Sequence, residues 1–235
     1  NLNIRCFSVY GTENIYLGGA QGDLGKSSDG GVTWTADSKG FNGNLYSIKF
    51  FDANTGIATG GYNGAVYLRT TNAGLSWDTN TIGEDYLESI RLLDENTAYV
   101  AGSGKIFKTT NKGANFIAYQ TYSGASWSDV SFPNENTGYT IYKYSVIDKT
   151  TDGGNSWMQY STQGTSENIY AADMVDANTG YCAYNPSNRP VYKTTNGGNS
   201  WAPLTTGLTG NIRDVDAVTA DIVYVCQTSG TQRVA

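Results

Sequence analysis

The sequence predicts an all-β protein, a β-propeller of four-stranded antiparallel blades, and three observations support this fold. A nine-residue motif recurs, and its final aromatic residue returns after 43, 39, 41 and 44 residues. Runs of alternating apolar and polar residues fill the intervals, and no segment of useful length has a helical period. Short strands repeating every 40 residues or so are typical of propeller blades. The copies are SSDGGVTWT (27–35), TTNAGLSWD (70–78), TTNKGANFI (109–117), TTDGGNSWM (150–158) and TTNGGNSWA (194–202).

One repeat, taken in order, contains four strand-like runs. Residues 45–50 alternate apolar and polar side chains, and the turn 52–56 (Asp-Ala-Asn-Thr-Gly) follows. A short strand over 57–60, a turn at 62–64 and a third strand over 65–70 come next. The motif then forms a tight turn, after which an outer strand begins at 76–79.

The repeats divide the chain into a single propeller domain, 1–235, with five complete blades and one partial blade. The sixth lacks the motif, so we expect a closed six-bladed ring, and the alternative is a fragment of a seven-bladed propeller. The chain begins at Asn1 without Met, so a processed or trimmed fragment is also expected. The blade ranges are 1–36, 44–79, 86–118, 127–159, 169–203 and 211–235.

Each position of the motif has a structural explanation. The short polar residue at its third position can accept hydrogen bonds from backbone N–H groups one to three residues later. The Gly two residues further on suits a positive φ, and the closing aromatic ring can lie between neighbouring blades. We therefore assign structural roles to Asp29, Trp34, Asn72, Trp77, Asn111, Phe116, Asp152, Trp157, Asn196 and Trp201.

This motif resembles the Asp-box, or BNR repeat, with the pattern Ser-x-Asp-x-Gly-x-Thr-Trp. Residues 27–34 match it fully, 150–157 match with Thr at the first position, and the other copies carry Asn for Asp. Asp-box propellers include sialidases, the sortilin ectodomain, xyloglucan hydrolases and the photosystem II assembly factor family. The turn Asp-x-Asn-Thr-Gly-Tyr looks most like the assembly factors and their bacterial surface relatives. The resemblance is specific for the fold and says little about function.

Composition excludes several functional classes. A formal net charge of −6 argues against a nucleic-acid partner, and no apolar run is long enough for direct membrane insertion. With no His, the usual zinc sites and Ser-His-Asp chemistry are excluded. We expect no metal and no cofactor. The three cysteines, Cys6, Cys182 and Cys226, are predicted to be buried free thiols.

An enzymatic function is the first alternative. A sialidase-like or glucanase-like glycoside hydrolase needs two carboxyl groups about 5–10 Å apart across a cleft. Glu84 and Asp85 form the only acidic pair in a variable loop, and nothing in the sequence places a second carboxyl group opposite them. We therefore predict no catalytic residue.

Variation between the repeats indicates where binding takes place. The first turn and the motif share one end of each blade and are uniform, whereas the loops at the other end differ in length and carry many Tyr residues. Variable loops on a rigid scaffold are where binding usually occurs. The predicted ligand-binding residues are Tyr62, Asn63, Tyr86, Tyr122, Tyr142, Tyr144 and Arg189.

These observations predict a non-catalytic binding or scaffold module that engages a protein or polysaccharide partner. The resemblance and the composition, rich in Tyr, Thr and Asn, imply an extracellular, cell-surface or periplasmic location. A membrane-protein assembly factor is the second alternative, although 15 Lys and Arg against 21 Asp and Glu leave little basic surface.

Overall fold

The computed structural model describes residues 3–38, 41–61, 64–83, 86–102, 105–121, 127–142, 146–161, 168–185, 191–208 and 212–227. Over these residues the chain consists of strands and turns, with a single 3-10 turn at Ala20–Gly22. No helix within them has the length and apolar character needed to cross a bilayer. The chain forms two compact units, Asn1–Tyr122 and Ser123–Ala235.

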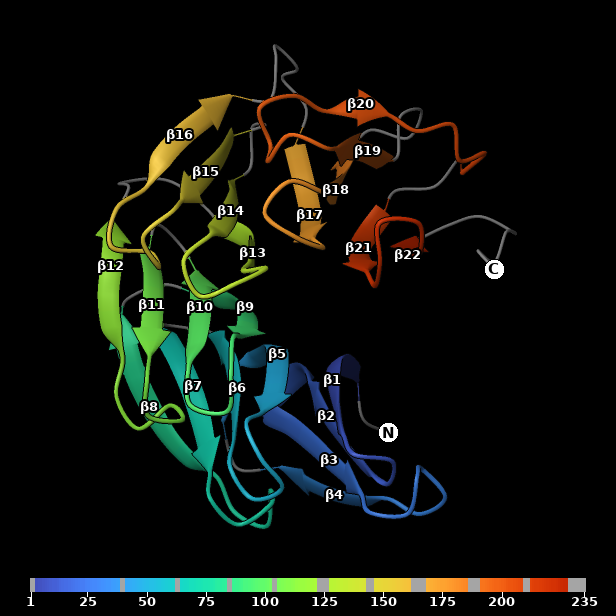
Figure 1. Cartoon of the computed structure of the whole chain (residues 1–235). Coiled ribbons are helices and arrows are strands. Elements are labelled where there is room, and N and C mark those ends of the chain that lie inside the picture. Colours follow the sequence, from blue (N-terminus) through green and yellow to red (C-terminus); the bar gives the residue numbers. More distant parts are fainter. Residues whose placement is uncertain are drawn as a thin grey trace. The chain divides into compact units, whose positions relative to one another are not determined.

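The first unit contains three antiparallel sheets, in each of which four strands pair in chain order (Figure 1). The first strands of neighbouring sheets contact one another, so we call them inner strands. The three sheets are β1 (Ile4–Tyr10), β2 (Asn14–Gly19), β3 (Asp23–Ser27) and β4 (Thr35–Ser38); β5 (Asn44–Phe50), β6 (Gly56–Gly61), β7 (Ala65–Thr70) and β8 (Asp78–Gly83); and β9 (Leu87–Leu92), β10 (Ala98–Gly102), β11 (Lys105–Thr109) and β12 (Ile117–Thr121).

The second unit repeats this design with two four-stranded sheets and one pair of strands. Its inner strands are again neighbours. The strands are β13 (Trp127–Ser131), β14 (Gly138–Tyr142), β15 (Val146–Thr150) and β16 (Met158–Ser161); β17 (Asn168–Met174), β18 (Gly180–Asn185), β19 (Val191–Thr194) and β20 (Ala202–Pro203); and β21 (Ile212–Ala217) with β22 (Val223–Gln227).

The hydrophobic core of each unit lies between adjacent sheets. In the first unit, Leu45, Ile48 and Phe50 of β5 pack together with Tyr16 and Leu24 of the preceding sheet. Each such apolar side chain contributes about 1.5–3 kcal/mol when it is fully buried. Within the described residues, five four-stranded sheets and one strand pair confirm the predicted all-β propeller of about six blades.

The repeated motif is a turn held by its own side chains. In the first copy, Gly31 N–H donates to Ser27 Oγ at 2.8 Å, and Thr33 N–H donates to Asp29 Oδ1 at 2.9 Å. The same two bonds recur in the other four copies. The donor to the third-position side chain is four residues on, not one to three as expected. Two successive residues of positive φ, Gly30 and Gly31 in this copy, fold the chain back far enough for that contact.

The aromatic residue that ends the motif is covered in four of the five copies. Trp77 is 9% exposed and meets Phe50 edge to face at 5.8 Å, and Phe116 meets Tyr67 at 4.9 Å. Trp157 and Trp201 are half-buried. Trp34 is 44% exposed, so the predicted position between two blades is wrong for this residue. Among the described residues of its unit, the sheet β1–β4 contacts only the sheet β5–β8, and Trp34 is not part of the hydrophobic cluster between them.

The motif and the first turn of the same sheet are joined by a hydrogen bond. Ala73 N–H donates to the carbonyl oxygen of Asn54 at 2.8 Å, and Gly197 N–H donates to that of Asn178 at 2.8 Å. Three further sheets have the equivalent bond. This confirms that the two uniform turns share one end of each sheet, so the inner strands begin at the other, variable end.

Candidate binding site at the start of the inner strands

Most of the predicted ligand-binding residues lie outside the described residues. These are Tyr62, Asn63, Tyr122, Tyr144 and Arg189, together with the acidic pair Glu84 and Asp85. Tyr142 is the last residue of β14, and its side chain is not among those described. Tyr86 is described: it immediately precedes β9 and is 42% exposed. Of the predicted ligand-binding residues, Tyr86 is therefore the one whose side chain and neighbours the structure describes.

Near its beginning, every inner strand contains a β-bulge at the equivalent position. In β1 the pairing with β2 passes from Ile4 directly to Cys6, so Arg5 has no partner in the ladder. The register skips one residue in the same way in each of the other five inner strands. A bulge re-aims a side chain and increases local twist, and bulges are frequent beside functional sites. The strand register skips Arg5, Tyr46, Glu88, Ser128, Tyr170 and Arg213 at these bulges.

In the first unit, three side chains from three neighbouring sheets form a connected row. The guanidinium carbon of Arg5 lies 5.9 Å from the centroid of the Tyr46 ring. Tyr46 in turn meets Tyr86 with ring centroids 6.4 Å apart and planes at 80°. Asn44 Nδ2 donates a long hydrogen bond of 3.4 Å to the Tyr46 hydroxyl oxygen. We call Arg5, Tyr46 and Tyr86 the aromatic–arginine row.

Buried neighbours hold this row in place. Leu45 is 0% exposed and Leu87 is 1% exposed, so the residues just before the bulges of β5 and β9 are anchored in the core. Gly61, at the end of β6, lies beside Tyr86; a Cβ at this position would stand 2.9 Å from Tyr86 Cδ1. Glycine is therefore required there for the ring to pack closely.

The row combines two kinds of recognition. A guanidinium stacked on an aromatic face keeps its in-plane N–H groups free for a carboxylate or phosphate. A partly exposed Tyr ring offers a flat apolar surface and a hydroxyl, which suit sugar rings and peptide side chains. The arrangement can therefore bind a partner.

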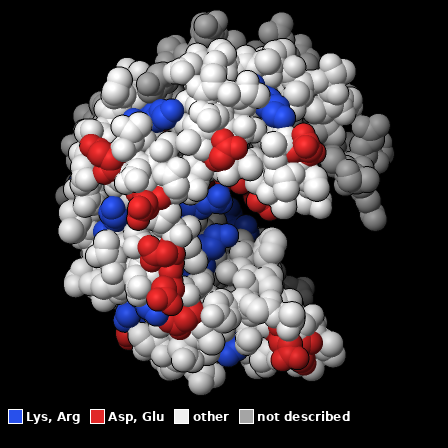
Figure 2. Space-filling model, in the orientation of Figure 1, with Lys and Arg blue, Asp and Glu red and all other residues white. Residues whose placement is uncertain are grey.

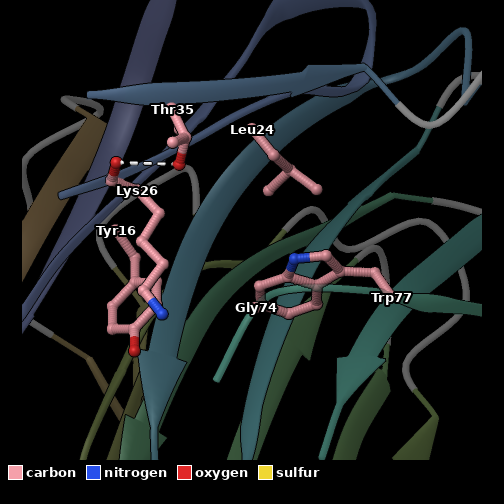
Figure 3. Close-up of a pocket in the computed structure, with 7 residues that line it drawn as sticks. Tyr16, Leu24, Lys26, Thr35, Gly74 and Trp77 are labelled. Atoms are coloured by element: carbon pink, nitrogen blue, oxygen red, sulfur yellow. Dashed lines mark hydrogen bonds between the residues drawn. The ribbon is translucent and has the colours of Figure 1, made fainter. Parts of the chain in front are cut away.

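A separate small cavity lies between the first two sheets of the first unit. It measures about 30 Å³ and is lined by Tyr16, Leu24, Lys26, Thr35 and Trp77 among others. Figure 3 shows Lys26 and Tyr16 side by side, with Trp77 across the cavity and the Thr35 hydroxyl donating to the Lys26 carbonyl oxygen. Sites for small ligands usually measure about 300–1,000 Å³, so this space suits one or two water molecules and belongs to the packing between sheets.

The carboxyl groups with shifted pKa values accept hydrogen bonds within the turns. Hydrogen bonds from the Thr33 side chain and backbone lower the pKa of Asp29 to about 2, and Ser156 does the same for Asp152. Backbone N–H groups of Asn178 and Thr179 lower the pKa of Asp176. Within the described residues, every carboxyl group with a resolved shift has a lowered pKa, whereas a general acid needs a raised one. No group of three or more Cys, Asp or Glu side chains in the same residues is placed to hold a metal ion.

Among the described residues on the face shown in Figure 2, charged side chains do not gather into one large patch. Groups of Asp and Glu side chains are separated by other residues, with Lys and Arg side chains near several of them. The inner strands of the first unit are different, with Arg5, Lys49 and Arg91 against the single acidic residue Glu88. A chain of net negative charge therefore has a locally basic set of inner strands.

The three cysteines are free thiols, as predicted, but they are not all buried. Cys182 is 0% exposed, Cys6 is half-buried, and Cys226 on β22 is exposed, so the prediction of burial is wrong for Cys226. Burial raises the pKa of Cys6 to about 12, and a hydrogen bond from the Gly18 backbone and the nearby charge of Lys49 oppose that rise only in part.

Sequence reasoning missed Arg5 and Tyr46. Both stand inside strands, whereas the prediction considered loops. A signal for them is present in the sequence. When the repeats are aligned on the first turn, the position six residues before that turn begins, such as Tyr46 before the turn 52–56, holds Arg, Tyr, Glu or Ser rather than an aliphatic residue. A bulge is what makes polar and aromatic residues acceptable there.

Comparison with known proteins supports the fold. No protein-family model matches the chain, and no curated protein matches it. Among solved structures, one described as YCF48 bound to D1 peptide has a TM-score of 0.65 and 14% identity, over 95% of this chain and 90% of that one. A GH74 xyloglucanase from Xanthomonas campestris has a TM-score of 0.76 and 11% identity, over 96% of this chain and 44% of the enzyme. The WD40 propeller domain of Doa1 has a TM-score of 0.70 and 12% identity. At these identities the similarity establishes a β-propeller.

Proposed function

We propose that this chain is a non-catalytic binding or scaffold propeller that works outside the cytoplasm and engages a protein or glycan partner through its variable end. The observation that supports this proposal is the aromatic–arginine row, which joins Arg5, Tyr46 and Tyr86 at that end. In the same proposal the repeated motif is an Asp-box, and its Asp and Asn residues stabilise turns.

The similar structures favour a binding role. The YCF48 structure is that of a propeller bound to a D1 peptide, which is an example of this fold holding a polypeptide. The xyloglucanase belongs to a glycan-degrading class, so a glycan remains the second kind of partner. A membrane-protein assembly factor is the second alternative, and a synthetic D1 peptide of the kind held by YCF48 is the partner to test.

The test of binding uses alanine variants in the described residues. Arg5→Ala, Tyr46→Ala and Tyr86→Ala should each weaken retention of the partner in pull-downs from cell-surface extracts and on glycan arrays by about tenfold, since buried interface anchors contribute 1–2 kcal/mol or more. Tyr224→Ala is the matched control, because Tyr224 is an exposed tyrosine (54%) on β22, far along the chain from the row. Equal retention by all four variants would contradict the proposal.

The glycoside hydrolase alternative has a direct test. Purified protein should release no sugar from xyloglucan or from chromogenic glycosides, because the carboxyl groups with resolved shifts in the described residues have lowered pKa values and cap turns. Turnover that is lost in Glu84→Gln or Asp85→Asn would replace the binding role with an enzymatic one. Cell fractionation tests the location: recovery in the cytoplasm alone would contradict that part of the proposal.

A further inference from the structure

One position in the second strand of a sheet packs against the sheet that follows. Tyr16 in β2 stacks on the Phe50 ring of the next sheet, with centroids 3.6 Å apart. Tyr181 in β18 donates from its hydroxyl to the carbonyl oxygen of Ala220 in the next sheet. Tyr224 is the equivalent residue of β22, because the turn before it closes with the same hydrogen bond as the turn before Tyr181. Tyr224 is 54% exposed, whereas Tyr16 and Tyr181 are at most 3% exposed. The last sheet therefore exposes a side chain that elsewhere covers a neighbouring sheet.

The first sheet exposes the matching surface. Phe7 and Val9 of β1 are 65% and 54% exposed, whereas the equivalent Ile48 and Phe50 of β5 are 1% and 4% exposed. Each pair stands two and four residues after the bulge of its strand. Trp34, at the end of the first copy of the motif, is 44% exposed. An exposed apolar surface made of several large side chains marks an interaction site.

These two sheets also carry the two halves of a polar contact that joins inner strands elsewhere. Asp173 Oδ2, three residues after the bulge of β17, accepts from the N–H group of Ala217, four residues after the bulge of β21, at 3.0 Å. The same bond joins β13 to β17. In the last sheet the accepting position holds Asp216, which is exposed and lies opposite Tyr224 on the same face. In the first sheet the donating position is the N–H group of Val9.

We propose that the face of β1–β4 that carries Phe7, Val9 and Trp34 binds the β21–β22 sheet of a second copy of this chain. In this contact the Tyr224 ring covers Val9 and Trp34. The Asp216 carboxylate accepts a hydrogen bond from the Val9 N–H group. Both faces are exposed in the single chain, so their cover comes from outside it, and a second copy carries both faces. The contact continues the packing of sheet on sheet that is already present in each unit.

Each copy carries one face of each kind, so the contact between copies is head to tail. A contact of this type forms a closed ring of copies or an open chain of them. The side chains of the aromatic–arginine row are not part of the contact, so loss of the contact leaves the row in place and the proposed binding function untouched.

The experiment is sedimentation velocity of the whole chain from about 1 μM to about 100 μM. We expect a mass of two copies or more at the upper end. Val9→Arg and Tyr224→Arg should each give the mass of one copy throughout. An equimolar mixture of these two variants should recover a two-copy species, because one variant keeps the Tyr224 face and the other keeps the Val9 face. Ile117→Arg is the control, since Ile117 is a 63% exposed apolar residue on the outer strand β12, and this variant should associate like the unaltered chain. Circular dichroism shows that each variant is folded.

Cys226 provides a second measurement that needs no variant. It is exposed and stands two residues after Tyr224, on the same face of β22. A thiol reagent should label it rapidly in dilute protein and about tenfold more slowly where the copies associate. The mass of one copy at every concentration overturns the inference, whether Cys226 then reacts rapidly or is covered within the single chain. Association that survives both arginine variants, or a mixture of them that stays at one copy, overturns it as well.

Discussion

Lys26 Nζ donates a 2.8 Å hydrogen bond to the carbonyl oxygen of Ala73, which joins β3 of one sheet to the repeated motif of the next. The Lys26 ammonium group also lies over the Tyr16 ring, 5.7 Å from its centroid. The same link recurs where Arg69 donates to the Lys112 carbonyl oxygen, and where Lys149 donates to that of Gly197. Within each unit, neighbouring sheets are therefore joined by a polar link as well as by apolar packing.

Replacing Lys26 by Met should lower the free energy of unfolding by about 1–2 kcal/mol, since it removes one charge-assisted hydrogen bond and one cation–π contact. Urea unfolding followed by tryptophan fluorescence measures the loss. Lys105→Met, at a half-buried lysine that begins β11, is the control. Equal losses in the two variants would show that the link to Ala73 contributes nothing of its own.

The ring that ends the motif should matter more in the second copy than in the first. Trp77 is 9% exposed and packs on Phe50, so Trp77→Ala should cost about 3–5 kcal/mol. Trp34 is 44% exposed and should cost less than half of that. Chemical denaturation of the two variants gives the comparison. A Trp34→Ala loss as large as that of Trp77→Ala would mean that Trp34 is covered in solution.

Two neighbouring residues of the motif should respond in opposite ways to substitution. Ala73 has a φ of 58° and Gly74 has a φ of 78°, both in the region that favours glycine. Ala73→Gly should be neutral or stabilising by up to about 1 kcal/mol, whereas Gly74→Ala should destabilise by about 1–2 kcal/mol. A Cβ on Gly74 would also stand 3.2 Å from Tyr16 Cε1. Thermal midpoints of both variants test the prediction, and a loss with Ala73→Gly would contradict it.

Acid should destabilise the protein between about pH 4 and pH 2 through the turn carboxylates. Burial opposes ionisation of Asp52 and is the largest single influence on it, but hydrogen bonds from Lys112, Asn54 and Thr55 together outweigh it and lower its pKa to about 2. Because the pKa is lower in the folded state than its ordinary value of 3.8, the stabilisation is complete above that value. It is lost as the pH falls through the folded pKa.

Asp52→Asn tests this dependence. The variant should lose the ion pair with Lys112, whose Nζ lies 2.8 Å from Asp52 Oδ2, and should show a smaller loss of stability between pH 4 and pH 2. The turn itself should survive, because Asn134 already holds the equivalent turn with two backbone hydrogen bonds. The measurement is the urea midpoint at a series of pH values, and parallel curves for the two proteins would contradict the assignment.

Thiol reactivity should distinguish the three cysteines. Cys226 is exposed on β22, whereas Cys182 is 0% exposed and the pKa of Cys6 is raised to about 12 by burial. A thiol reagent at neutral pH should label Cys226 rapidly and the other two only on unfolding. Peptide mapping after a short reaction identifies the labelled residue. Rapid labelling of Cys182 would contradict the burial of β18.

Much of the fold could be predicted from the motif, because the hydrogen bonds that form its turn join residues close together in the sequence. Its turn is closed by bonds over two and four residues, such as Ser27 Oγ to Asp29 Oδ1 at 2.7 Å, so nine residues contain the information that forms it. Alternation of apolar and polar residues, as at Ile48, Lys49 and Phe50, then assigns the strands and the buried face. Repetition at a nearly constant spacing supplies the rest, since each sheet must bury its apolar face against another of the same kind.

The candidate site could not be read in the same way. Arg5, Tyr46 and Tyr86 are about 40 residues apart in sequence, and only the packing of three sheets brings them together. The bulges that aim Arg5 and Tyr46 arise from the pairing of two strands, and no single repeat marks them: their signal appears only when the repeats are aligned. Exposure of Trp34 and Cys226 also depends on which sheets lie beside them. The sequence by itself determined the repeat, its turns and its strands, because those depend on short-range hydrogen bonds and periodicity. Tertiary structure alone decided which side chains meet, because that depends on contacts between different repeats.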